Sequence, residues 1–156
     1  MSIKCIQDYY EERFSYCYGC GRLNKDGHHF KTYWDGDETV TRYTPDPQHI
    51  SLPGFVYGGL LASMIDCHGT GSAALAYAKE NNIELIEFNA PRFVTGSLSV
   101  SYKKPTPMGL ELEVRGTIRE IKGRKVVIEA TLLAGKDVCA TGEIVSLLVP
   151  EDFGKK

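Results

Sequence analysis

The longest regular pattern in the chain runs from about Gly58 to Lys79, where apolar residues recur at helical spacing. At about 100° per residue, bulky side chains fall on one side of the predicted helix and small ones on the other. We expect the bulky side to pack on a sheet and the small side to let another backbone approach. The bulky side holds Leu60, Leu61, Met64, Ile65, His68 and Leu75, and the small side holds Gly59, Ala62, Ser63, Asp66, Thr70 and Ala73.

Alternating apolar and polar residues elsewhere predict β-strands joined by short turns. In the first strand after the helix, Leu98, Val100 and Tyr102 share one face. Short links between long strands favour antiparallel pairing. The pattern therefore predicts an α+β fold, one long helix against one antiparallel sheet. We expect a short helix at 6–14, and strands at 28–34, 39–43, 98–102, 110–118, 126–132 and 138–149.

Length and composition narrow the class of protein. A chain of 156 residues predicts one domain over 1–156, with a turn-rich lead-in over 1–27 and a tail over 150–156. Its net charge of −2 argues against a strong nucleic-acid binder. The N-terminal segment lacks the apolar stretch of a signal peptide, and no apolar run is long enough to span a membrane. With five irregularly spaced cysteines, we expect a reduced, cytoplasmic protein.

Two features of the long helix suggest chemistry. Asp66 lies on the small, uncharged side, which makes it a candidate for a cleft, with a solvent-exposed charge as the alternative. Gly58 and Gly59 begin the helix, where free backbone N–H groups stabilise developing negative charge. Glycine there also lets a carbonyl substrate approach the backbone closely, and tight packing is the alternative explanation.

The spacing between these features predicts an oligomer. Eight residues of helix place Gly58 and Asp66 about 12 Å apart, too far to act on one carbonyl. In a two-fold dimer with antiparallel helices, Gly58 of one chain meets Asp66 of the other, and two equivalent sites form. We therefore expect a homodimer or a dimer of dimers.

These residues, in this order, resemble the hotdog-fold acyl-CoA thioesterases of the 4-hydroxybenzoyl-CoA thioesterase superfamily, and in particular the PaaI-like branch. The resemblance implies a hotdog fold, in which a curled antiparallel sheet wraps one long central helix. It covers most of the chain. Its motifs are Cys17-Tyr18-Gly19-Cys20-Gly21 with Asn24 and Gly27, the segment Pro53–Gly59 followed by Asp66, and the segment Leu98–Pro105.

The resemblance implies a hydrolase that cleaves an acyl-CoA thioester without a cofactor. Asp66 then acts as general base or nucleophile, the Gly58 N–H polarises the thioester carbonyl, and Thr95 assists the acid or the water. One position departs from the family, because many relatives carry histidine just before the glycine pair and this chain has Tyr57. We expect the substrate to be bound by Gly59, Tyr57, His49, Phe55, Arg124 and Lys125.

Several residues have competing interpretations. His68 points about 200° away from Asp66, so we expect a buried, hydrogen-bonded histidine rather than a base. The CxxC formed by Cys17 and Cys20 is a weak zinc signal without a second pair, although Cys5, His28 and His29 are possible partners on paper. We expect no metal, and we expect Cys67 and Cys139 to be small core residues. The basic residues at 103–104 and 122–125 either bind the CoA phosphates or form solvated turns.

Two other functions remain open from the sequence. A hotdog hydratase or dehydratase acting on acyl thioesters usually needs a histidine beside the acid, and only His49 is available to pair with Asp66. A non-catalytic acyl-thioester-binding protein is the other alternative, and Tyr57 gives it some weight. No nucleic-acid or membrane partner is expected.

Overall fold

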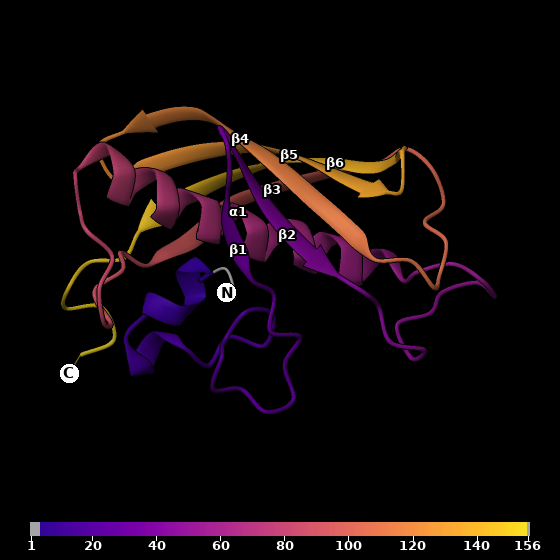
Figure 1. The fold of residues 1–156 in the computed structure, drawn as a ribbon, viewed down its shortest axis with the longest axis horizontal. Helices are drawn as coiled ribbons and strands as arrows, with labels where there is room; N and C mark the ends of the chain where they lie inside the picture. The colour runs from indigo at the N-terminus through magenta and orange to yellow at the C-terminus, as the bar shows by residue number, and fades with distance from the viewer. Residues whose placement is uncertain (1–3, 156) are drawn as a thin grey trace.

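The computed structural model describes residues 4–155, which form one helix-and-sheet body with a compact N-terminal lead-in (Figure 1). The sheet order is β1-β2-β4-β5-β6-β3, and every neighbouring pair is antiparallel. The elements are the 3₁₀ turns η1 (Ile6–Tyr9) and η2 (Glu12–Phe14), helix α1 (Gly58–Glu80), and strands β1 (Thr32–Asp35), β2 (Glu38–Tyr43), β3 (Phe93–Tyr102), β4 (Leu112–Lys122), β5 (Lys125–Ala134) and β6 (Asp137–Leu148).

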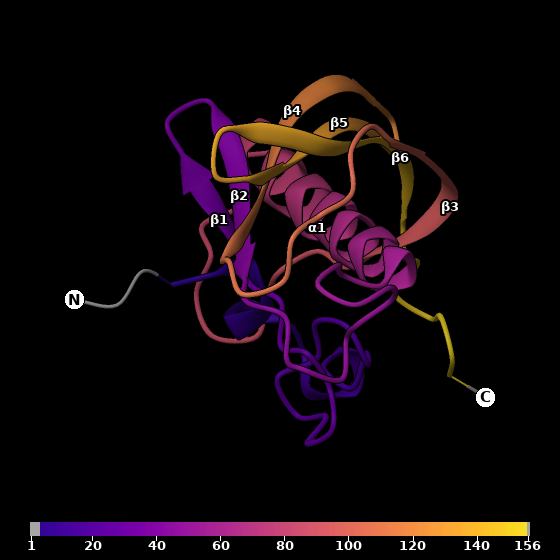
Figure 2. The same cartoon turned by 90° about the vertical axis from the view of Figure 1, so that its right-hand side faces the viewer.

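The sheet curls around α1, as the view along the helix shows most clearly (Figure 2). This arrangement confirms the predicted α+β fold with one long helix and one antiparallel sheet. None of the helices within 4–155 is long and apolar enough to cross a membrane.

Helix α1 begins directly after Tyr57 and ends where Asn82 adopts a left-handed backbone with φ of 53°. All six residues of the predicted bulky side are buried, in the interior enclosed by the sheet. The small side behaves differently in its two halves. Its first part, Gly59, Ala62, Ser63 and Asp66, is half-exposed, whereas Thr70 and Ala73 are buried beneath another segment of the chain.

The lead-in explains why the second half of α1 is buried on all sides. A Cβ added at Gly71 would lie 2.9 Å from the Gln7 amide nitrogen and 2.8 Å from the Thr32 hydroxyl, so the lead-in contacts the helix directly there. Gln7 also accepts a hydrogen bond from the Thr32 N–H at 2.9 Å. In this half of the helix, the segment that approaches the small side is the chain's own N-terminal lead-in.

Several predicted elements differ at their ends. Strand β3 begins at Phe93, five residues before its expected start, and β4 ends at Lys122, four residues after its expected end. The helix expected over 6–14 is instead the two 3₁₀ turns, separated by the extended Tyr10. The strand expected from His28 begins only at Thr32, because His29 has a φ of 58° and breaks the extended path. The N–H groups of His28 and Phe30 bond to carbonyls of Tyr18 and Gly19, so this stretch belongs to the lead-in.

Strand β3 forms one edge of the sheet, paired on one side only, with β6. Its register shifts between Thr95 and Ser97, which is the signature of a bulge with one extra residue. A bulge changes the alternation of side chains along a strand. Thr95 and Tyr102 therefore both reach α1, although seven positions separate them.

Candidate active site

Asp66 forms the acidic end of the candidate site. The side chain is half-buried in the middle of α1, and the Thr95 hydroxyl on β3 donates a hydrogen bond to its Oδ1. One carboxylate oxygen is thereby held in place, while Oδ2 has no hydrogen-bond partner among residues 4–155. A carboxylate held in this way retains an oxygen that can accept a proton from water.

Gly58 forms the second part of the candidate site, at the first turn of α1. Its carbonyl accepts a hydrogen bond from the Tyr102 hydroxyl at 2.8 Å. Within the described part of the chain, the N–H groups of Gly58 and Gly59 have no acceptor, whereas the Leu60 N–H bonds back to the Tyr57 carbonyl. Two free donors at the positive end of a 23-residue helix can stabilise an oxyanion.

Tyr57 lies over the second glycine. A Cβ added at Gly59 would fall 2.5 Å from the Tyr57 ring, so the ring occupies the space that a side chain at 59 would need. The Tyr57 N–H donates to the His49 carbonyl at 2.9 Å, and the ring remains largely exposed. The phenol therefore stands beside the free N–H groups at the start of the helix.

The remaining predicted binding residues lie at different ends of the molecule. His49 stacks edge-on against His28, and its Nδ1 accepts the Asp46 N–H at 2.9 Å, so its ring is directed into loop packing. Phe55 is partly exposed in the turn before α1, where it pairs with Pro107. Both residues lie near the Gly58 end of the helix.

Arg124 and Lys125 lie at the β4–β5 turn, away from Gly58 of the same chain. Arg124 donates to the Leu148 carbonyl, and Leu148 pairs with Phe93 at the opposite end of β3 from Tyr102. Lys125 pairs with Glu120 at 3.6 Å. A separate hollow next to Gly58 is lined by Tyr102, Lys103 and Lys104. The basic residues that share a hollow with Gly58 are therefore these two lysines and not those of the β4–β5 turn.

His68 is a structural residue, as the sequence predicted. It is fully buried, with Nδ1 2.8 Å from the Thr41 hydroxyl and Nε2 3.1 Å from the Thr39 hydroxyl. A neutral imidazole can donate with one nitrogen and accept with the other, so two hydroxyls satisfy it. Burial lowers the pKa of His68 to about 3, so the ring stays neutral in the folded protein.

This shift predicts a loss of stability in acid. The unfolded chain binds a proton at His68 below its ordinary pKa of 6.5, whereas the folded chain does not do so until about pH 3. The free energy of unfolding should therefore fall as the pH drops through this range, by about 2 kcal/mol from this residue at pH 5. Urea titrations at pH 7.5 and pH 5 measure the free energy of unfolding at each pH. The variant His68→Gln should show a smaller difference between the two values. An equal pH dependence in the variant would contradict the assignment.

Sequence reasoning did not identify Tyr102 as a contact of the glycine pair. The alternation predicted that Leu98, Val100 and Tyr102 share a face, but it did not indicate which part of the helix that face meets. It also placed Cys67 in the core without connecting it to Cys17 and Cys20, although all three sulfur atoms lie close together. The contact of Tyr102 with Gly58 and that of Cys67 with Cys17 and Cys20 each join segments far apart in the sequence, so no local sequence pattern predicts them.

Comparison with known proteins connects this geometry to one family. A model of the thioesterase superfamily matches residues 53–141, which include Gly58, Asp66 and Thr95. The crystal structure of a thioesterase superfamily protein from Shewanella loihica PV-4 is 44% identical, with a TM-score of 0.67. That similarity covers 90% of this chain and 100% of the Shewanella chain.

Two further similarities are more distant. Acyl-coenzyme A thioesterase THEM4 from Xenopus laevis is 28% identical over 110 residues, which are 70% of this chain and 44% of that protein. The present chain therefore spans less than half the length of the curated relatives it matches. The structure of smu.793 from Streptococcus mutans UA159, bound to acetyl-CoA, has a TM-score of 0.58 at 16% identity, covering 77% of this chain and 88% of that one. At this identity only the fold is shared.

Proposed function

Because the chain belongs to the thioesterase superfamily, we propose that it hydrolyses an acyl-CoA thioester to a free acid and CoA. The observation that carries this proposal is the half-buried Asp66, held by the Thr95 hydroxyl on an otherwise uncharged face of α1. Acyl-CoA is the substrate class in the names of the THEM4 relatives, and acetyl-CoA is bound in the Streptococcus structure.

In the proposed mechanism, Asp66 activates the attack on the thioester carbonyl. It acts either as a base, removing a proton from the attacking water, or as a nucleophile that forms an anhydride for water to cleave. The Thr95 hydroxyl orients the carboxylate in both routes. The free Gly58 N–H donates to the carbonyl oxygen as negative charge develops there. The electrons of the broken C–S bond leave with the CoA thiolate, which then takes up a proton.

The two groups act across a dimer in this proposal. Eight helical residues separate Gly58 from Asp66 by about 12 Å within one chain. The ten-residue strand β3 is paired with β6 on one side only, so its other edge is open, and Val94, Leu98 and Tyr102 are exposed along the strand. Long exposed edges with apolar side chains are usually covered by another strand. Pairing of two such edges about a two-fold axis would bring the neighbouring helices together.

The structure favours hydrolysis over hydration or dehydration. A hydratase of this fold usually needs a histidine that works with the acid. Here the imidazole of His68 is used by Thr39 and Thr41. The Nδ1 atom of His49 accepts a hydrogen bond from the Asp46 N–H in the loop before α1. No histidine within residues 4–155 hydrogen-bonds to Asp66.

A release assay tests the proposed function. The protein is incubated with a panel of short, long and aromatic acyl-CoA esters, and free thiol is measured with a chromogenic disulfide. We expect steady thiol release with at least one ester. Formation or loss of a double bond without thiol release would assign the hydratase, and tight binding of the esters without turnover would assign a binding protein. The panel includes 3-hydroxyacyl and α,β-unsaturated esters as well as saturated ones, so that all three outcomes can be detected.

A further inference from the structure

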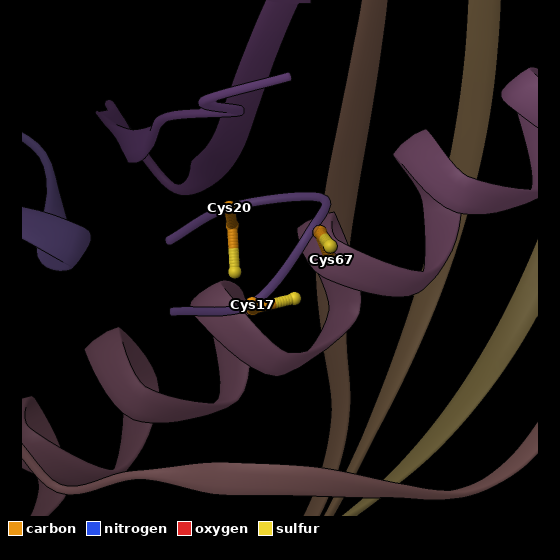
Figure 3. Close-up of side chains that lie close together, drawn as sticks. All are labelled: Cys17, Cys20 and Cys67. Carbon is orange, nitrogen blue, oxygen red and sulfur yellow. The ribbon is translucent and has the colours of Figure 1, made fainter. Parts of the chain in front are cut away.

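Three cysteine sulfurs meet where the lead-in crosses helix α1 (Figure 3). Cys17 and Cys20 come from the lead-in, and Cys67 comes from the helix turn that also carries Asp66. The three Sγ atoms all lie within 4.8 Å of one another, and Cys20 and Cys67 are buried. All three are free thiols. We call them the cysteine cluster.

The backbone around the cluster is shaped to hold these sulfurs. A Cβ added at Gly19 would fall 2.3 Å from Cys67 Sγ, so only glycine lets the third sulfur reach the loop. The Gly21 N–H donates to the Cys17 carbonyl at 2.7 Å, and this turn holds Cys17 and Cys20 in one tight loop.

The guanidinium of Arg92 and the phenol of Tyr10 lie beside the cluster. The charge of Arg92 acts on Cys17, Cys20 and Cys67, and its guanidinium stacks on the Tyr10 ring. Within residues 4–155, no carboxylate forms an ion pair with Arg92. Tyr10 is buried, and its hydroxyl has no hydrogen-bond partner in the described chain. The surroundings therefore provide a positive charge without its counter-ion and a polar atom without a partner.

We propose that the cysteine cluster binds one zinc ion through the Sγ atoms of Cys17, Cys20 and Cys67. Tetrahedral zinc with Zn–S bonds of about 2.3 Å separates its sulfurs by about 3.8 Å, so each pair here is at most about 1 Å too far apart. Binding releases the thiol protons to solvent and involves no redox change. The fourth position is left to water or an external ligand, because no fourth cysteine, histidine or carboxylate joins the group within residues 4–155.

Charge favours zinc over a monovalent soft ion. Three thiolates carry three negative charges, a divalent ion supplies two positive charges, and Arg92 supplies the third. Copper(I) also prefers thiolates, but it would leave one negative charge buried without compensation. With a divalent ion, the charges of the three thiolates, the ion and Arg92 sum to zero. Arg92 then has a counter-charge in the bound cluster, although no carboxylate within residues 4–155 pairs with it.

The zinc ion would join the lead-in to the helix one residue beyond Asp66. The CxxC loop lies close against α1, since a Cβ added at Gly19 would meet Cys67 Sγ at 2.3 Å and the Phe30 ring at 3.5 Å. A metal bond across this contact would stabilise the folded chain, because the ligands are far apart in the unfolded one. This inference concerns metal binding and does not depend on the proposed hydrolysis.

Metal content tests the proposal without any thioester. The full chain is purified under reducing conditions and dialysed first against a zinc-containing buffer and then against a metal-free buffer. Its metal content is measured by elemental mass spectrometry. We expect about one zinc per chain, and less than about a tenth of that in Cys67→Ser. Cys139→Ser is the matched control, since Cys139 is also a buried cysteine but lies outside the cluster, and it should keep its zinc.

A second measurement on the unmodified chain guards against misfolded variants. Cobalt(II) added to the metal-free protein should produce thiolate charge-transfer absorption and the intense visible bands of tetrahedral cobalt, and added zinc should remove them. Absence of both zinc and these bands would overturn the proposal. A mass loss of two hydrogens mapped to two cysteines of the cluster, without bound metal, would also overturn it in favour of a disulfide. Thioester turnover affects neither readout, so the two proposals fail separately.

Discussion

Replacing Asp66 with Asn is expected to lower kcat for a hydrolysed acyl-CoA by about 10²- to 10⁴-fold, the range that a general base contributes. The amide has nearly the same shape and can still accept the hydrogen bond from Thr95 through its oxygen. It cannot take a proton from water or attack as a nucleophile. The fold and the dimer should persist, because Asp66 is only half-buried and makes no ion pair among the described residues.

The comparison needs a control carboxylate and a check of assembly. Asp26→Asn removes an exposed acid from the lead-in and should leave turnover unchanged. Elution volume and melting temperature of Asp66→Asn should match those of the unmodified chain, and kcat is measured at saturating ester. Turnover within a factor of about three of the unmodified protein would mean that Asp66 is not the base or nucleophile.

Replacing Gly58 with Pro should lower kcat by about 10²- to 10³-fold, the cost of one lost oxyanion donor. Gly58 is the first residue of α1, where proline is well tolerated because its missing N–H has no partner within the helix. Tyr57 has φ of −59° and ψ of 125°, which suits a residue before proline. The substitution therefore removes the N–H while preserving the helix.

The variant Gly58→Ala separates the effect of losing the N–H donor from the effect of filling the space at residue 58. An added Cβ at this position meets the Tyr102 ring at 3.5 Å, an ordinary van der Waals distance, and the N–H remains. We expect alanine to retain most of kcat and proline to lose it, measured with the same ester. Equal losses in the two variants would attribute the effect to space at the helix start and contradict the role of the N–H.

The fold was predictable because its periodicities are long and consistent. Helix α1 was expected from helical spacing and strands β3 to β6 from alternation, and the structure confirms them with end shifts of up to five residues. The errors lie where a local conformation breaks the pattern. The left-handed His29 interrupts an otherwise extended segment, and the bulge near Gly96 changes which β3 side chains face the helix. Hydrophobic alternation carries no information about either feature.

The candidate site was predictable only in part. Asp66 and Gly58 could be selected because a carboxylate on a small, uncharged helix face and a glycine pair at a helix start are unusual in the sequence itself. The pairing of Thr95 with Asp66 depends on strand register, and the resemblance to a family supplied it. Tyr102 and the cysteine cluster escaped prediction because each contact joins segments more than 40 residues apart, and residue spacing says nothing about contacts of that kind.

The central claim is that each site takes Gly58 from one chain and Asp66 from its partner. Asp66→Asn and Gly58→Pro chains are coexpressed with different tags, and the mixed dimer is isolated by two affinity steps. One of its two sites then has both groups intact, and the other has lost both. The cross-chain site predicts that the mixed dimer recovers about half of the unmodified kcat per dimer. Activity as low as that of the two parent variants would contradict it.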